Sequence, residues 1–325
     1  MTEGTATGTV AATAAASPAA TPGVGGRFEE RVERAIRRLG RARLRAIRHA
    51  LTIVGILSLP YIIVTNQAKS MFGFDAYAYW AIDLGDLYGR SLGNTSDLGA
   101  FRYTPVFGQV FAPAHALPWE LFLGIWCLAM AAALVWFGGR STILLLAFPP
   151  VPLELYHGNI HLFMAVAIVV GFRFPMAWAF LLLSKVTPGI GVLWFAFRRE
   201  WRSFGIAVGG TAAITAVSFA LAPNLWSDYV RTMVDNLGYD PGHPYPVPIP
   251  LPIRTAAAAL IVWYAARTDR RWLVPAAAVL ALPIIWFHGL AVLLAMIPLW
   301  REDTARHRAA GSDPATPTAT ATVTG

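Results

Sequence analysis

The chain has 325 residues, of which 56% are hydrophobic and only 14% are charged, and its mean hydropathy is +0.52. In soluble domains about a quarter of all residues are charged, so this composition excludes an ordinary soluble protein and indicates an integral membrane protein. The net charge of +8 does not indicate nucleic-acid binding, because many basic residues cluster before the first apolar run, as membrane orientation and contact with anionic lipid require.

Both ends of the chain are tracts rich in Ala, Thr, Gly and Pro. Residues 1–26 and the last part of the cytoplasmic tail assigned to 301–325 lack apolar periodicity, and we expect them to be disordered. The basic segment 27–48 is predicted to form an amphipathic helix on the cytoplasmic surface. No small-residue cleavage site follows the apolar run 51–64, which is therefore predicted to stay in place as a signal anchor.

Apolar segments continue from residue 49 to residue 300, and they predict a transmembrane domain. A span needs about 20 apolar residues, which gives eight to ten helices and the fold class of an all-α polytopic membrane protein. The distribution of basic residues places both termini in the cytoplasm. Two long loops then lie outside, at about 67–118 and 223–250, and long loops usually carry function.

The first outer loop opens with "MFGFDAYAYWAIDLGDLYGR". Asp75 precedes a helix-like stretch, so it is either an N-cap or a general base that takes a proton from an acceptor hydroxyl. Asp83 and Asp86 are predicted to lie on a solvated polar face. They form no tight cluster, so we predict neither a metal nor a cofactor. Further along, 106–112 is predicted to be a short surface or re-entrant helix, because prolines bound an apolar run too short to span.

A lysine interrupts a later apolar segment, "FLLLSKVTPGIG". A charge at such a position costs about 2.5–3.5 kcal/mol on insertion scales and usually has a function or a partner. The Thr-Pro-Gly sequence at 187–189 would break the helix and expose backbone groups to a cavity. Lys185 is predicted either to have a functional role in that cavity or to snorkel from a short span. Arg102, in "FRYTP", is either a bidentate ligand for an anion or part of a salt bridge within the loop.

Aromatic and amide side chains on the outer side are candidates for substrate contact. Tyrosines can stack on a sugar, but at a membrane interface they also form a belt. In "YHGNIH" the polar side chains would face the same cavity, and helix capping explains the asparagine equally well. His243 and His288 also lie on the outer side and could orient a substrate. Of these side chains, we predict substrate contact for Tyr77, Tyr103, His157 and Asn159.

Several short motifs occur in a characteristic order: Asp-x-x-Tyr after the first span, "GDLYG", "FRYTP" with "FAP", "HGNIHLFMAVAIVV", "SKVTPGIGVLWFAFRREWRSF" and "LAPNLWSDYV". Over about residues 50–235 this order resembles the polyprenol-phosphate-mannose-dependent α-mannosyltransferases of glycosyltransferase family 87. The resemblance implies a GT-C-like helix bundle. It also implies an inverting enzyme of the cell envelope that moves a sugar, most readily mannose, from a polyprenyl-phosphate donor to a lipid or glycan acceptor at the extracytoplasmic face of the plasma membrane.

The resemblance also implies a role for Asp75 as the general base, with Lys185 and Arg102 at the donor phosphate. Its partners would be the lipid-linked donor, the acceptor and membrane lipids, without nucleic acid; no P-loop for a nucleotide is present. A membrane transporter is one alternative, although the second copy of "SKVTPG" that paired broken helices would require is absent. A noncatalytic envelope lipid-binding protein is the other alternative.

Overall fold

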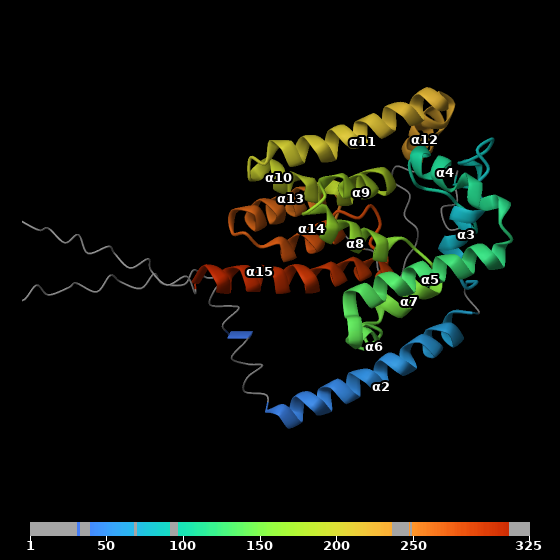
Figure 1. Cartoon of the computed structure of the whole chain (residues 1–325). Helices are drawn as coiled ribbons and strands as arrows, with labels where there is room; N and C mark the ends of the chain where they lie inside the picture. Colours follow the sequence, from blue (N-terminus) through green and yellow to red (C-terminus); the bar gives the residue numbers. More distant parts are fainter. Residues whose placement is uncertain are drawn as a thin grey trace, which may run out of the picture. The chain divides into compact units, whose positions relative to one another are not determined.

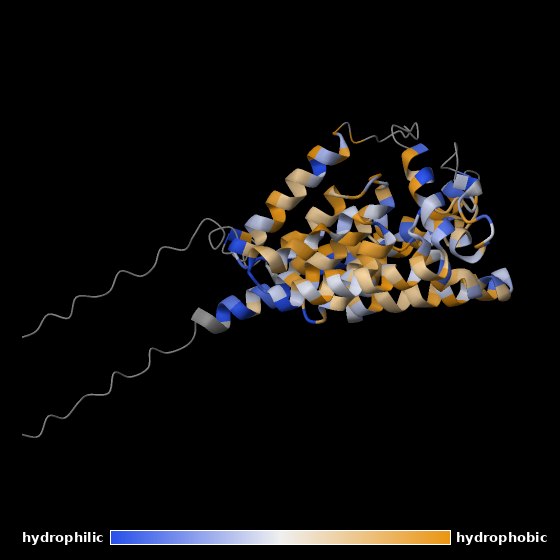
Figure 2. Cartoon of the chain, turned by 90° about the horizontal axis from the view of Figure 1, so that it is seen from above, coloured by the Kyte–Doolittle hydropathy of each residue, from blue (hydrophilic) through white to orange (hydrophobic). Residues whose placement is uncertain are grey.

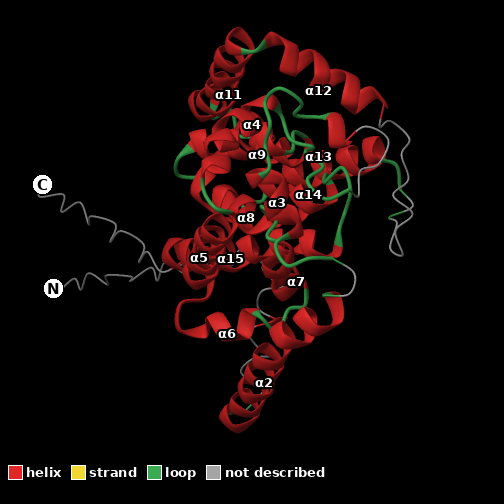
Figure 3. Ribbon diagram, turned by 90° about the vertical axis from the view of Figure 1, so that its right-hand side faces the viewer, coloured by secondary structure: helices red, strands yellow, loops and turns green. Residues whose placement is uncertain are grey.

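The computed structural model describes residues 31–32, 40–67, 70–91, 97–235, 247 and 249–311, and within these ranges all regular structure is helical (Figure 3). The protein is an all-α polytopic membrane protein, as its composition predicts. The α-helices are α2 (Arg41–Asn66), α3 (Phe74–Trp80), α4 (Pro105–Phe111), α5 (Trp119–Gly138), α6 (Thr142–Leu145), α7 (Pro150–His157), α8 (His161–Gly171), α9 (Trp178–Ser184), α10 (Leu193–Phe197), α11 (Trp201–Leu221), α12 (Pro223–Asp235), α13 (Leu251–Arg267), α14 (Val274–Leu280) and α15 (Met296–Gly311).

The chain divides into a first unit, Met1–Ala50, and a second unit, Leu51–Gly325. In the first unit, the predicted tail 1–26 and much of the predicted basic helix 27–48 lie outside the described residues. The described basic residues from Arg41 onward belong to α2, which continues without a break into the first apolar span.

Three helical segments are long and apolar enough to cross a membrane: Arg43–Asn66, Trp119–Leu145 and Trp201–Leu221. A fourth results if α7 and α8, which meet at a bend of 112°, count as one span. Other predicted spans are shorter apolar helices in the described chain, such as Pro175–Ser184. Broken helices are tolerated at membrane depth when other parts of the protein surround them. The difference from the predicted eight to ten spans therefore reflects many short or interrupted segments.

The long helices and the short ones occupy different environments. Along α2, α5 and α11 large apolar side chains are exposed, for example Leu57, Leu128 and Leu221, as expected of surfaces that face lipid. The apolar colouring of these helices is visible in Figure 2. In α8 and α14, by contrast, most side chains are buried. The short helices therefore form the core.

The core brings together segments that are far apart in the sequence. The 3₁₀ helix η7 (Phe287–Ala295) packs along α8 and against α7, while α14 packs against α13 and η7 (Figure 1). These contacts place the turn between α7 and α8 beside the start of η7. Figure 3, which faces the end of the molecule that carries α3, shows loops gathered there.

The segment after α2, predicted to be the first outer loop, is anchored on that turn. The backbone N–H of Gly73 donates to the Tyr156 carbonyl over 2.8 Å, and the Tyr156 hydroxyl donates to the carbonyl of Ser70 over 2.5 Å. Trp126, on α5, donates its indole N–H to the carbonyl of Gly158 over 2.7 Å. The predicted short helix at 106–112 is confirmed as α4. The loop therefore holds α3 in a fixed place against α5 and α7.

One predicted boundary differs from the structure. α15 continues to Gly311, past residue 300, where we expected the cytoplasmic tail to begin; residues 312–325 lie outside the described chain. The segment 223–250, predicted to be the second outer loop, begins with α12, and most of its remainder, including His243, is not among the described residues.

Gly158 closes α7 in the left-handed conformation, with φ of 71°, and a Cβ at this position would approach the Ala76 Cβ to 2.8 Å. Gly158→Ala is therefore expected to lower the free energy of unfolding by about 1–3 kcal/mol. Thermal unfolding in detergent measures the change. Gly124→Ala is the matched control, because nothing lies within 4 Å of a Cβ there. Equal unfolding midpoints for the two variants would contradict the expectation.

Candidate active site

A cavity of about 570 Å³ lies where α3, the segment before α4, the α7–α8 turn and residues 285–288 meet. Its volume is in the range of sites that bind small molecules or cofactors. Six of the seven sequence-predicted site residues line it: Asp75, Arg102, Tyr103, His157, Asn159 and Lys185. The seventh, Tyr77, packs its ring against Trp80 and Trp119 instead, with centroids 5.4 and 5.3 Å away.

Asp75 lies in the first turn of α3, whose N-cap is Gly73. The N-cap alternative for Asp75 is therefore wrong, because the helix begins two residues earlier than that alternative requires. The Asp75 side chain is 26% exposed, and its Oδ2 accepts a hydrogen bond from Asn159 Nδ2 over 2.8 Å. Its carboxylate is thus held by one donor while part of it remains accessible.

Asn159 is fixed at both ends of its amide. Its Oδ1 accepts the backbone N–H of Ile160 over 2.7 Å, and its Nδ2 donates to Asp75. Because Oδ1 is occupied by a donor, the amide nitrogen has to face the carboxylate. The N-cap of α8 is Ile160, so Asn159 is not the helix cap that one interpretation predicted. Its place in the cavity wall agrees with the other interpretation, as a site residue.

Lys185 lies between α9 and the 3₁₀ helix η5 (Thr187–Val192), with extended backbone angles of −135° and 104°. The predicted break in the helix is confirmed. The Lys185 Nζ is 3.0 Å from the His161 Nε2 and 5.8 Å from the centroid of the Tyr103 ring. The lysine thus has partners inside the protein, and it lines the cavity.

Two buried tyrosines form the wall near Lys185. The hydroxyls of Tyr79 and Tyr103 are 2.7 Å apart, and the Tyr88 hydroxyl donates to the Tyr103 carbonyl over 2.8 Å. Burial raises the pKa of the Tyr79 and Tyr103 phenols well above the ordinary value. Both hydroxyls therefore stay protonated at neutral pH and present neutral hydrogen-bonding groups to the cavity.

Histidines close another side of the cavity. The His157 ring lies 5.1 Å from the His288 ring and 6.4 Å from that of Phe74. The buried Nε2 of His288 makes no hydrogen bond within the described chain and is 3.6 Å from the Asp75 Oδ2. A carboxylate, an amide, an ammonium group and imidazoles therefore converge on one space, which suits acid–base chemistry on a polar, charged substrate.

A model of glycosyltransferase family 87 matches residues 101–312. The chain belongs to glycosyltransferase family 87. No curated protein and no solved structure matches it. The protein is therefore a membrane glycosyltransferase, and the transporter and the noncatalytic lipid-binding alternatives are set aside. The match continues well beyond residue 235, where we expected the resemblance to end.

The family-87 match begins after α3, so Asp75 lies outside the matched residues. Its hydrogen-bond partner Asn159 lies inside them, as do Arg102 and Lys185. The structure thus joins a carboxylate from outside the matched segment to polar residues within it.

Sequence reasoning missed Glu154 of this glycosyltransferase, which was not among the predicted site residues. Glu154 is fully buried on α7; its Oε1 accepts the backbone N–H of His161 over 2.6 Å and its Oε2 is 3.0 Å from His161 Nδ1. The signal was present, because an acid inside an apolar segment requires a partner for the same reason as Lys185.

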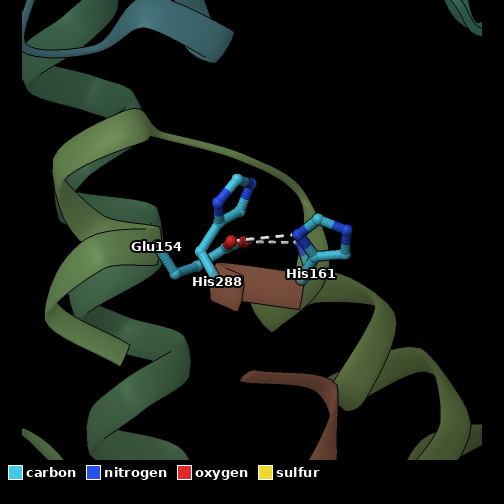
Figure 4. Close-up of side chains that lie close together, drawn as sticks. All are labelled: Glu154, His161 and His288. Carbon is cyan, nitrogen blue, oxygen red and sulfur yellow. Dashed lines mark hydrogen bonds and ion pairs between the residues drawn. The ribbon is translucent and has the colours of Figure 1, made fainter. Parts of the chain in front are cut away.

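Figure 4 shows Glu154 and His161 joined by these contacts, with the ring of His288 beside them. Donor atoms of the three residues lie within 4.8 Å of one another. Glutamate and histidine are zinc ligands in many enzymes. Both ring nitrogens of His161, however, already have partners, Glu154 and Lys185.

Proposed function

We propose that this glycosyltransferase moves a sugar, most readily mannose, from a polyprenyl-phosphate donor to a hydroxyl of a lipid or glycan acceptor, with inversion at the anomeric carbon. The observation that carries the proposal is that Asp75 and Lys185 line one cavity. A proton acceptor and a cation within one space are what transfer from a sugar phosphate to a hydroxyl demands. We further propose that the helices form a GT-C-like bundle.

In the proposed reaction the Asp75 carboxylate takes the proton of the acceptor hydroxyl as its oxygen attacks the anomeric carbon. The bond between that carbon and the phosphate oxygen breaks, and polyprenyl phosphate leaves with the electron pair. Lys185 and Arg102 stabilise the charge that develops on the phosphate. Attack opposite the leaving group inverts the anomeric carbon. Tyr103, His157 and Asn159 complete the proposed substrate contacts.

The location of the cavity supports a lipid-linked donor. Asn66, the last residue of α2, lines the cavity, and α2 is long enough to cross a membrane. The cavity therefore lies near the end of a span, where the phosphate of a membrane lipid would be. The basic residues of α2 are at its other end, and basic residues favour the cytoplasmic side. We therefore assign the reaction to the extracytoplasmic face of the plasma membrane, with both termini in the cytoplasm.

The test uses purified full-length protein in lipid nanodiscs with radiolabelled polyprenyl-phosphate mannose and a mixture of envelope lipids as acceptors. We expect transfer of the label and, in the product, an anomeric configuration opposite to that of the donor. Parallel reactions with glucose or arabinose on the same lipid identify the sugar. Transfer from a nucleotide sugar without lipid carrier, or no transfer from any polyprenyl-phosphate sugar, would refute the proposed donor.

Asn159→Ala removes the donor to Asp75 and is expected to lower kcat by about ten- to a hundredfold, because the base loses its orientation. Steady-state transfer assays measure this change. Asn159→Asp keeps the acceptor for the Ile160 N–H but sets a second carboxylate against Asp75, so its loss should be at least as large. Full activity in both variants would contradict the orienting role.

Transfer is expected to be unchanged after treatment with EDTA, because lysine and arginine supply the positive charge at the phosphate in the proposed mechanism. The rate before and after treatment, with Mg²⁺ and Zn²⁺ added back separately, measures the effect. A loss that one of these ions restores would show that a metal takes part.

A further inference from the structure

A buried chain of contacts connects Glu154 to Lys185 through the ring of His161. The Glu154 Oε2 is 3.0 Å from His161 Nδ1, and His161 Nε2 is 3.0 Å from the Lys185 Nζ. Glu154 and His161 are fully buried, and neither lines the cavity, whereas Lys185 does. The mechanism proposed above uses only the last member of this chain.

We infer that Glu154 and His161 are positioning residues that hold the ammonium group of Lys185 charged and directed at the donor phosphate. The contacts between Glu154, His161 and Lys185 are observed in the structure. Their role at a phosphate rests on the proposed function. The two residues act through Lys185 and do not touch the substrate.

When Lys185 is charged, the hydrogen-bonding capacity of each group sets the direction of every bond. An ammonium group only donates, so Nε2 of His161 accepts from Lys185 and Nδ1 carries the proton. Nδ1 then donates to Glu154 Oε2. The other oxygen, Oε1, accepts the backbone N–H groups of His161 over 2.6 Å and Leu162 over 3.4 Å. All bonds to Glu154 are thus donated to it, which is the pattern of a carboxylate.

The chain also balances charge. An isolated ammonium group in an apolar interior is strongly disfavoured unless an opposite charge is near. Glu154 supplies a negative charge one imidazole ring away from Lys185, and the ring transmits the interaction through its two nitrogens. The long lysine side chain is in this way held in one position before a phosphate arrives, so less ordering is needed during the reaction.

A metal ion is the competing interpretation of the same residues, since His288 lies close to Glu154 and His161. A divalent cation bound to His161 would have to replace one of its two hydrogen bonds and would lie near the Lys185 ammonium. Repulsion between the two positive charges disfavours that arrangement. The hydrogen-bonded chain satisfies every donor and acceptor of His161 without a metal.

The first test compares two substitutions of one residue. Glutamine can place its amide oxygen close to the position of His161 Nε2, whereas the shorter asparagine reaches only the region of Nδ1. We expect His161→Asn to weaken the binding of sugar-free polyprenyl phosphate about tenfold, and His161→Gln to weaken it less than about threefold. In a Lys185→Met background, His161→Asn should cause no further loss of affinity. Equal losses for Asn and Gln, or an additive loss in that background, would overturn the positioning role.

The second test needs no ligand and so separates this inference from the proposed function. Glu154→Gln and Lys185→Met are each expected to lower the unfolding midpoint by about 5 °C or more. The first leaves the half-buried Lys185 ammonium without this carboxylate, and the second leaves the fully buried Glu154 carboxylate without this cation. The double variant should be more stable than either single variant. Additive losses of stability in the double variant would contradict the coupling between Glu154 and Lys185. The inference would also be overturned if the purified protein contained stoichiometric zinc and removal of that zinc by EDTA lowered the midpoint. If coupling appears but wild-type protein binds no polyprenyl phosphate, the chain stands, and both the proposed donor and the role of the chain at its phosphate are refuted.

Discussion

Asp75→Asn is expected to lower kcat for sugar transfer by about a thousandfold. The asparagine has nearly the same shape and can still offer Oδ1 to the amide of Asn159, but it cannot take the proton of an acceptor hydroxyl. Binding of sugar-free polyprenyl phosphate should remain within about threefold of wild type, because in the proposed mechanism Lys185 and Arg102 contact the phosphate. Transfer assays with saturating donor measure kcat, and binding measurements give the affinity for polyprenyl phosphate.

The matched control for this variant is Asp83→Asn. Asp83 is an exposed carboxylate in the same outer loop, its Oδ1 accepts the backbone N–H of Gly85 over 2.8 Å, and an asparagine retains that acceptor. Asp83 does not line the cavity that holds Asp75. We expect wild-type transfer from the control. Undiminished turnover by Asp75→Asn would remove Asp75 as the base, and the proposed mechanism would fail with it.

Lys185→Met is expected to lower kcat/KM by about a hundred- to a thousandfold, because the phosphate loses a charged donor inside a partly enclosed cavity. Methionine fills most of the volume of the lysine stem, so the loss is one of charge. The effect should be larger for donors whose leaving group is a poorer one, since those depend more on stabilisation of the departing phosphate. Initial rates at limiting donor, on protein shown to be folded by circular dichroism, measure the change.

Arg231→Met is the control for loss of a positive charge. Arg231 lies on α12, its side chain is 70% exposed, and its ion pair with Asp228 is long, at 3.6 Å. It is not among the lining residues of the cavity. Transfer by this variant should equal that of wild type. A Lys185→Met enzyme that kept its kcat/KM would show that the lysine serves only the packing of the helix break.

Local sequence patterns determined the class of protein, the family and the broken helix. Hydropathy is a property of short windows, so apolar runs and the prolines that bound α4 could be read directly. The break after Ser184 followed from a lysine and a Thr-Pro-Gly sequence, whose backbone effects are local. The order of motifs predicted glycosyltransferase family 87, because motifs can be recognised in the sequence without knowledge of contacts in the fold.

The length of each helix and the direction in which its side chains point were decided by tertiary packing. The sequence could not separate a full span from two short helices, since surrounding protein can satisfy a broken backbone where lipid cannot. It also predicted Tyr77 as a substrate contact, although Tyr79 is the tyrosine of α3 that lines the cavity. The two residues lie on different sides of α3, so that Tyr77 packs on Trp119 while Tyr79 reaches Tyr103.

The partners in the site belong to the tertiary structure alone. Asp75 meets Asn159, and Lys185 meets Glu154 through His161, across separations in the chain that no local pattern encodes. The sequence by itself required a partner for each charge, because an unpaired charge in an apolar environment is too costly. Which residues fill that requirement depended on the packing of α7, α8 and η7, and so only the folded chain decided it.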